Sequence, residues 1–201
     1  MADASEALIV IDIQNDFCPG GALAVAGGDE IVPRVNALMQ EYPVTVLTQD
    51  WHPEEHSSFA VLHDEPAFST VEMPYGAQTL WPVHCVWGTP GAAFHPALNV
   101  DPADLILRKG FRAHVDSYSA FFENDRRTPT GLAGYLRERG ISDLTFVGLA
   151  LDFCVAWSAI DAAKLGFRAR VLEGACRAID LNGSLAAARD AMRAAGVTLA
   201  K

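Results

Sequence analysis

The chain has little that marks a secreted or a membrane protein. Its 201 residues include four cysteines, too few for a disulfide framework. The segment 73–100 carries no charged residue, but four prolines interrupt it, so it cannot form a long apolar helix. The first residues lack the positive charge that a secretory signal places before its apolar run. We therefore expect a soluble cytoplasmic protein with reduced thiols.

Positive charge is also scarce. The chain has 15 Lys and Arg against 25 Asp and Glu, a formal net charge of -10. This balance argues against nucleic acid and anionic membrane surfaces as partners, because both need a basic face. Half of the residues are hydrophobic, which excludes a disordered chain. The length fits one domain, and we expect residues 1–201 to form it.

The pattern along the chain alternates between strands and helices. Short apolar runs predict strands at 7–13, 44–48, 105–107, 144–147, 168–172 and, less clearly, 197–199. Helical spacing of apolar residues predicts helices at 29–40, 131–139, 153–165 and 184–195. This alternation predicts an α/β fold with a parallel sheet covered by helices on both faces. The segment 50–104 lacks strong periodicity but holds five of the six histidines, which indicates a functional region.

Reactive side chains follow four of the predicted strands. In order along the chain they are Asp12, the pair Asp50 and His52, Lys109, and Cys154. Because ligands of open parallel sheets bind at the carboxyl ends of the strands, we expect these groups to lie along one edge. Together they would supply a thiol, an ammonium, two carboxylates and an imidazole.

Cys154 stands at the start of a predicted helix, where backbone N–H groups and the helix dipole favour an anion. This placement would lower the pKa of a nucleophilic thiol, but a free thiol is also often a buried packing residue, and spacing alone does not decide. Asp12 is either a general base for that thiol or a turn residue. Lys109 either balances the charge of Asp12 or lies at the surface. The remaining cysteines fit packing roles: Cys18, Cys85 and Cys176.

A second group of residues has the composition of a metal site. Asp50 and His52 are alternate residues and point to the same side, and His56 or His84 could complete the set. One carboxylate with two imidazoles suits a divalent transition metal, although histidines can also cap loops. We assign the other histidines to loops: His63, His95 and His114. Three aromatic residues either wall a pocket for a flat ring or pack the core: Phe17, Trp81 and Tyr118.

Seven segments closely resemble the nicotinamidases of the isochorismatase-like cysteine hydrolases. They are V-I-D-I-Q-N-D-F at 10–17, Q-D-W-H-P at 49–53, H-S-S-F-A at 56–60, W-P-V-H-C-V at 81–86, K-G at 109–110, D-S-Y-S-A-F at 116–121 and D-F-C-V at 152–155. The resemblance covers nearly the whole chain. The D-W-H-P and W-P-x-H-C-V segments are its specific part, since the Asp, Lys and Cys alone would indicate only the wider superfamily.

The resemblance implies a fold, a reaction and a catalytic set. The fold is a single three-layer α/β domain, isochorismatase-like, with a six-stranded parallel sheet. The reaction is hydrolysis of nicotinamide to nicotinate and ammonia, often with pyrazinamide as a second substrate. Cys154 is then the nucleophile, Asp12 the base and Lys109 the third member of the triad. The N–H groups of Ala150 and Cys154 form the oxyanion hole, next to a cis peptide bond between Leu149 and Ala150.

The resemblance also implies a metal and a ring-binding pair. Asp50, His52 and His84 hold a divalent ion that binds the pyridine nitrogen, with zinc first and iron or manganese also suitable. Phe17 and Trp81 stack on the ring, whereas His56 and Tyr118 receive no fixed role. Relatives include homo-oligomers. The alternatives are an amidohydrolase for ureido or carbamoyl compounds, whose relatives generally lack the metal set, and a non-enzymatic metal-dependent binding module.

Overall fold

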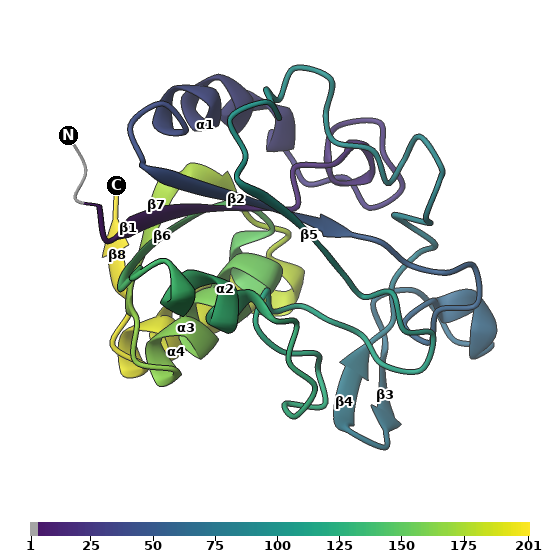
Figure 1. Cartoon of the computed structure of the whole chain (residues 1–201). Helices are drawn as coiled ribbons and strands as arrows, with labels where there is room; N and C mark the ends of the chain where they lie inside the picture. Colours follow the sequence, from purple (N-terminus) through teal and green to yellow (C-terminus); the bar gives the residue numbers. More distant parts are fainter. Residues whose placement is uncertain (1–3) are drawn as a thin grey trace.

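A six-stranded parallel sheet forms the centre of the molecule, in the order β5-β2-β1-β6-β7-β8 (Figure 1). The computed structural model describes residues 4–201. The strands are β1 (Glu6–Ile11), β2 (Val44–Asp50), β5 (Leu105–Lys109), β6 (Asp143–Leu149), β7 (Arg168–Arg177) and β8 (Thr198–Ala200). The predicted parallel sheet is confirmed, including the short last strand.

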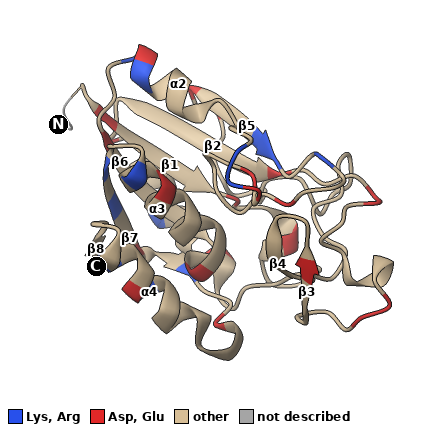
Figure 2. Ribbon diagram, turned by 90° about the horizontal axis from the view of Figure 1, so that it is seen from below, with Lys and Arg blue, Asp and Glu red and all other residues tan. Residues whose placement is uncertain are grey.

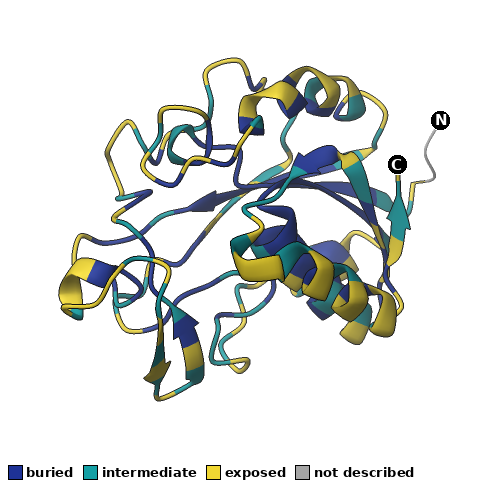
Figure 3. Cartoon of the chain, turned by 180° about the vertical axis from the view of Figure 1, so that it is seen from behind, coloured by how far each residue is buried: buried dark blue, intermediate teal, exposed yellow. Residues whose placement is uncertain are grey.

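Helices cover both faces of this sheet. Helix α1 (Val32–Leu38) lies on one face, and α2 (Leu132–Glu138), α3 (Ala156–Lys164) and α4 (Ser184–Ala194) lie on the other (Figure 1). Alternate residues of β1 enter opposite cores, because successive strand side chains point to opposite faces. Leu8 and Val10 belong to one buried cluster, and Ile9 and Ile11 to the other. Figure 3 shows the buried sheet between helices whose outer faces are exposed.

Several element ends differ from the prediction. β1 stops at Ile11 because Asp12 has a φ of 46°, a left-handed conformation that ends an extended strand. The helix predicted from residue 153 begins as a π-helical turn, Leu151–Val155, that leads into α3. The helix predicted over 29–40 is a 3-10 turn, Gly28–Ile31, followed by α1. Shorter 3-10 turns occupy Asn15–Phe17, Ala60–Leu62 and Leu181–Gly183.

The segment 50–104 contains an antiparallel hairpin that the sequence did not predict. Its strands are β3 (Thr70–Met73) and β4 (Gly76–Thr79). It projects beyond the carboxyl ends of the sheet strands (Figure 1). The strands are short, and only Gln78 is buried in them, so no apolar alternation reveals them. Across residues 4–201, no helix has the length and apolar character needed to cross a membrane.

Candidate active site

The carboxyl ends of β1, β2, β5 and β6 bring the predicted reactive residues together. Asp50 and Lys109 are the last residues of β2 and β5 and are register partners. The end of β5 is basic in Figure 2. Asp12 follows β1, and Cys154 follows β6 in the π-helical turn. All four side chains are buried, so charge here is compensated by neighbouring groups rather than by water.

The Lys109 ammonium lies at the centre of this group. Its Nζ is 2.8 Å from Asp12 Oδ2 and 3.5 Å from Cys154 Sγ, and it donates to the Ser117 carbonyl at 2.9 Å. It also donates to Asp50 Oδ1. Oxygen atoms of Asp12 and Asp50 and the sulfur of Cys154 all lie within 4.8 Å of one another. A thiol, a carboxylate and an ammonium cation are therefore in direct reach of each other.

The mutual charges set the protonation states. Burial opposes the ammonium, but Asp12 and Asp50 hold the pKa of Lys109 well above its usual range. Burial favours the acid form of Asp50, but Lys109 and His52 hold the pKa of that carboxyl far below its usual range. Burial raises the pKa of Asp12 to about 6, against the opposing effect of Lys109. At pH 7 the site thus has a cation between two carboxylates.

The thiol differs from the expectation based on its helix start. Burial raises the pKa of Cys154 well above its usual range, and the lowering effect of Lys109 does not overcome it. The low thiol pKa predicted from the sequence was therefore wrong for the resting site: desolvation dominates over the helix terminus. A thiol in this state needs a nearby base to accept its proton.

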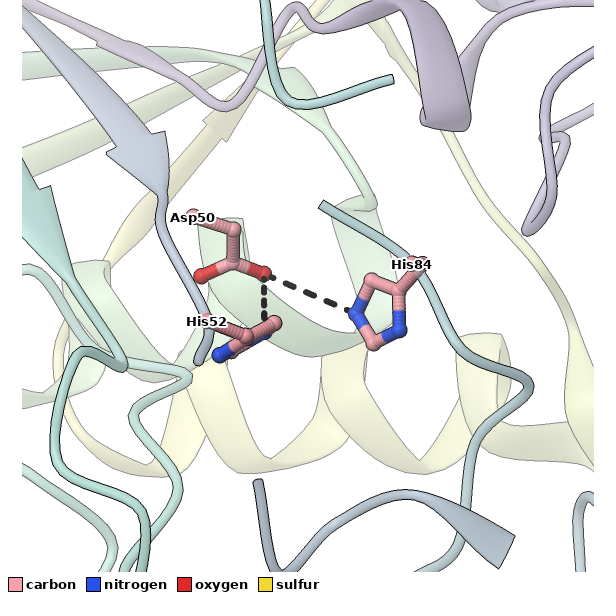
Figure 4. A group of neighbouring side chains, drawn as sticks. All are labelled: Asp50, His52 and His84. Atoms are coloured by element: carbon pink, nitrogen blue, oxygen red, sulfur yellow. Dashed lines mark ion pairs between the residues drawn. The ribbon is translucent and has the colours of Figure 1, made fainter. Parts of the chain in front are cut away.

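Asp50, His52 and His84 form a compact donor set (Figure 4). Asp50 Oδ2 lies 3.5 Å from Nε2 of His52 and 3.9 Å from Nε2 of His84. His52 Nδ1 lies 2.7 Å from the Gly110 carbonyl and His84 Nδ1 2.8 Å from the Pro82 carbonyl. A carbonyl can only accept, so each Nδ1 carries a hydrogen, and Nε2 is the atom of each ring that would face a metal ion beside Asp50. These residues fit a divalent transition metal.

Gly110 makes room for the His52 ring. Its φ is 67°, and a Cβ at this position would lie 2.4 Å from His52 Cε1. The same residue supplies the carbonyl that fixes the His52 tautomer. The K-G pair at the end of β5 therefore contributes to both groups of the site, because Lys109 contacts the carboxylates and Gly110 leaves room for an imidazole.

The His56 ring packs against the His52 ring, with 4.1 Å between the centroids, but has different hydrogen-bond partners. Its Nδ1 lies 2.8 Å from Ser58 Oγ and its Nε2 3.3 Å from the Val115 carbonyl. Burial lowers its pKa to about 3, so the ring is neutral. His52, His56 and Asp116 also come within 4.8 Å of one another. We favour the Asp50 set as the metal centre, because both nitrogens of His56 already face protein groups.

A small cavity of about 20 Å³ adjoins these groups, lined by Phe17, Trp81, Ala150 and Cys154 among others. This volume is room for about one water. Tyr118 also lines the cavity, and its hydroxyl accepts from Trp81 Nε1 at 3.1 Å. The Leu149–Ala150 bond beside the cavity is cis, as the resemblance implied.

A larger groove of about 640 Å³ lies elsewhere, between α3 and α4. Alanines make up most of its lining, and its one carboxylate, Asp152, already accepts hydrogen bonds from the Ile179 and Asp180 N–H groups and the Ser184 hydroxyl. The chemistry therefore points to the smaller cavity. The cysteines assigned to packing are free and buried: Cys18, Cys85 and Cys176.

Three buried polar residues near the site were missed from the sequence. Gln14 and Thr48 hydrogen-bond to Asp50 and Asp12, respectively. Asp116 lines the cavity, and its carboxylate accepts from Gln78 Nε2 and the Ser117 N–H, both at 2.8 Å. A usable signal existed for Gln14 and Thr48, because each stands two positions from a predicted functional carboxylate in the same strand region.

Comparisons with known proteins agree with this arrangement. The isochorismatase domain model matches residues 6–201. A nicotinamidase of Acinetobacter baylyi is 57% identical over 192 residues, which cover 95% of this chain and 90% of that protein.

Solved structures extend the likeness to three dimensions. The nicotinamidase and pyrazinamidase of Acinetobacter baumanii has a TM-score of 0.99 and 54% identity, covering 100% of this chain and 98% of that one. An L. infantum protein in complex with nicotinate has a TM-score of 0.87 and 39% identity, covering 100% and 94%. A Pyrococcus horikoshii pyrazinamidase in complex with zinc has a TM-score of 0.79 and 34% identity, covering 98% and 99%. This chain belongs to the isochorismatase domain family, among its nicotinamidases.

Proposed function

We propose that this protein hydrolyses nicotinamide to nicotinate and ammonia through a thioester on Cys154, and that it also deamidates pyrazinamide. The observation that carries the proposal is the position of Lys109 Nζ, 2.8 Å from Asp12 and 3.5 Å from the Cys154 sulfur, beside a carboxylate–imidazole set. Relatives at up to 57% identity named as nicotinamidases support the choice of substrate.

Proton transfer to Asp12 begins the reaction. Because burial keeps the Cys154 thiol protonated and the pKa of Asp12 is about 6, the carboxylate is the available acceptor at pH 7. The sulfur forms a bond to the amide carbon as its proton moves to Asp12. The N–H groups of Ala150 and Cys154 donate to the developing oxyanion. Lys109 stays protonated and compensates the charge.

The same carboxyl group serves both later steps. Asp12 returns the proton to the amide nitrogen, the C–N bond breaks, and ammonia leaves a thioester behind. Asp12 then accepts a proton from water as the water oxygen attacks the thioester carbon. The C–S bond breaks, the sulfur takes back the proton from Asp12, and the product leaves as nicotinic acid, which becomes nicotinate as its proton passes to ammonia or solvent. One water is consumed, and the thiol and the carboxylate are regenerated.

Asp50, His52 and His84 are the residues that would hold the metal ion, for which we propose zinc. The zinc complex of the P. horikoshii pyrazinamidase supports this choice. When bound, the ion would supply a Lewis acid for the ring nitrogen of the substrate. Phe17 and Trp81 would contact the faces of the ring, and this positioning places the carboxamide beside Cys154.

The test is product stoichiometry. The zinc-loaded protein should form one nicotinate per ammonia from nicotinamide, and a chelator should stop the reaction until zinc is restored. Mass spectrometry of the quenched enzyme should detect the acyl group on Cys154. A zinc-loaded protein that leaves nicotinamide intact, or that hydrolyses ureido compounds instead, would overturn the proposal.

A further inference from the structure

The two functional carboxylates lie beyond the end of the ladder that pairs β1 with β2. The last register pair of this ladder is Val10 with Leu47. Asp12 follows the end of β1 and Asp50 is the last residue of β2, and here the backbone ladder between β1 and β2 no longer fixes the separation of the two segments. Side-chain hydrogen bonds hold the two segments together instead. They come from one residue after β1 and one residue of β2.

Gln14 holds the backbone of Asp50. Its Nε2 donates to the Asp50 carbonyl at 2.8 Å, and its Oε1 accepts the Asp50 N–H at 2.8 Å. The second Nε2 hydrogen goes to the Ala92 carbonyl at 2.9 Å. The side chain is fully buried. Both amide hydrogens are thus used. Gln14 bonds the N–H and the carbonyl of Asp50 as a neighbouring strand would.

Thr48 makes the reverse contact: a β2 side chain holds Asp12, the residue after β1. Its hydroxyl donates to Asp12 Oδ1 at 2.6 Å and accepts the Asp12 N–H at 3.2 Å. Asp12 has a φ of 46°, which side-chain-bearing residues seldom adopt, so its conformation needs support from outside. The Thr48 hydroxyl binds both the backbone and the carboxylate of this residue, and Thr48 is itself fully buried.

We propose that Gln14 and Thr48 are reciprocal positioning residues: the chain of β1 places the metal ligand Asp50 through Gln14, and β2 places the base Asp12 through Thr48. This inference rests on the proposed function. Lys109 bridges the two carboxylates, so their separation determines where a metal-bound ring presents its carboxamide to Cys154. A displacement near 1 Å in such an arrangement can cost about a hundredfold in rate.

The first arm of the test measures zinc affinity by competition with a chelator, with no substrate present. Gln14→Met removes the amide at similar length, and zinc affinity should fall by about 10- to 100-fold. Gln49→Met is the matched control, because the buried Gln49 side chain donates to the same Ala92 carbonyl at 2.8 Å and accepts from Arg108 Nε, whereas only the Gln14 amide bonds the Asp50 N–H and carbonyl. Its zinc affinity should equal that of the wild type.

The second arm measures turnover. Thr48→Val removes the hydroxyl at nearly constant volume, so kcat should fall about 10- to 100-fold with zinc affinity unchanged, and Thr48→Ser should restore most of the rate. A merely structural role would lower stability without separating these two readouts. If Gln14→Met does not fold, Gln14→Asn, which withdraws the amide by one methylene, gives the same comparison.

Wild-type zinc affinity in the folded Gln14 variant, or wild-type kcat in Thr48→Val, would overturn the positioning roles. Failure of the proposed function looks different: the wild-type protein itself would release no ammonia from nicotinamide. The zinc arm remains readable in that case, because it needs no turnover.

Discussion

The two ends of the sheet hold their charged side chains in opposite ways. At the carboxyl end, the side chains of Asp12 and Lys109 are 0% exposed and that of Asp50 is 6% exposed. At the amino end, Arg168 pairs with Asp143, and their side chains are 74% and 25% exposed. Both ends pair a basic residue with aspartate, but only the carboxyl end withdraws the charged groups from water.

The contribution of an ion pair to the free energy of unfolding differs between the two ends. An exposed ion pair contributes about 0.2–1 kcal/mol, because water already solvates both partners. A buried pair carries a desolvation cost that can exceed its Coulombic gain, so it is a poor device for stability alone. We infer that the carboxyl end keeps its charges for chemistry, and that substitutions there change activity far more than substitutions at the amino end.

The largest effect is expected for Cys154→Ala. Ammonia release from nicotinamide should fall by at least about a thousandfold, because no other group supplies the thioester, while the melting temperature changes little. Cys176→Ala is the control, since this thiol is also buried but lies in β7 and donates to the Leu172 carbonyl. Turnover by Cys154→Ala at the wild-type rate would show that the nucleophile is another group.

Removal of one imidazole should have the next largest effect. His84→Ala leaves Asp50 and His52 without their third partner, so zinc affinity should fall by more than about a hundredfold and the KM for nicotinamide should rise. Elemental analysis and steady-state kinetics measure these changes. The exposed His114 gives the control, His114→Ala, which should retain its metal. Full zinc occupancy in the His84 variant would remove that residue from the ligand set.

Alanine variants of two glycines can distinguish the cost of backbone strain from the effect of crowding the site. Gly110 and Gly140 have φ values of 67° and 70°, but a Cβ at Gly110 would meet the His52 ring, whereas a Cβ at Gly140 would meet nothing within 4 Å. Both alanine variants should lose about 1–2 kcal/mol of stability from the left-handed conformation. Only Gly110→Ala should also lose zinc affinity, by about tenfold or more. Equal zinc affinity in the two variants would contradict the role of Gly110.

The sequence predicted the positions of the six strands, although not all of their ends, because apolar runs and the polar residues near them are local features. Asp12 interrupts such a run, Asp50 and Lys109 each stand two residues after one, and parallel topology brings all three to one edge. The sequence alone therefore predicted that these residues lie together at one edge of the sheet. The resemblance to the family then predicted the role of each residue.

Other features depend on distant contacts that no local pattern encodes. Gln78 is buried because its amide meets Asp116 and Tyr118, which come about 40 residues later in the chain. The raised pKa of the Cys154 thiol comes from desolvation by surrounding elements, which outweighs its position at a helix start. The positions of Gln14 and Thr48, two residues from Asp12 and Asp50, indicate only that they lie near the site; that each hydrogen-bonds to the carboxylate residue of the other segment follows from the spacing of β1 and β2.

The smallest effect is expected at the amino end. Hydrogen bonds from Arg168 lower the pKa of Asp143, so the stability contributed by this carboxylate is present above the unfolded pKa of about 3.9 and is lost as the pH falls through the lower folded value. Solvent screening limits the contribution, and Asp143→Asn should therefore cost at most about 1 kcal/mol at pH 7. Urea unfolding of both proteins measures this difference, which should shrink toward about pH 3 and in high salt. A loss of several kcal/mol that persists in acid would mean that the amino end is as strongly coupled as the site, and the contrast between the two ends would fail.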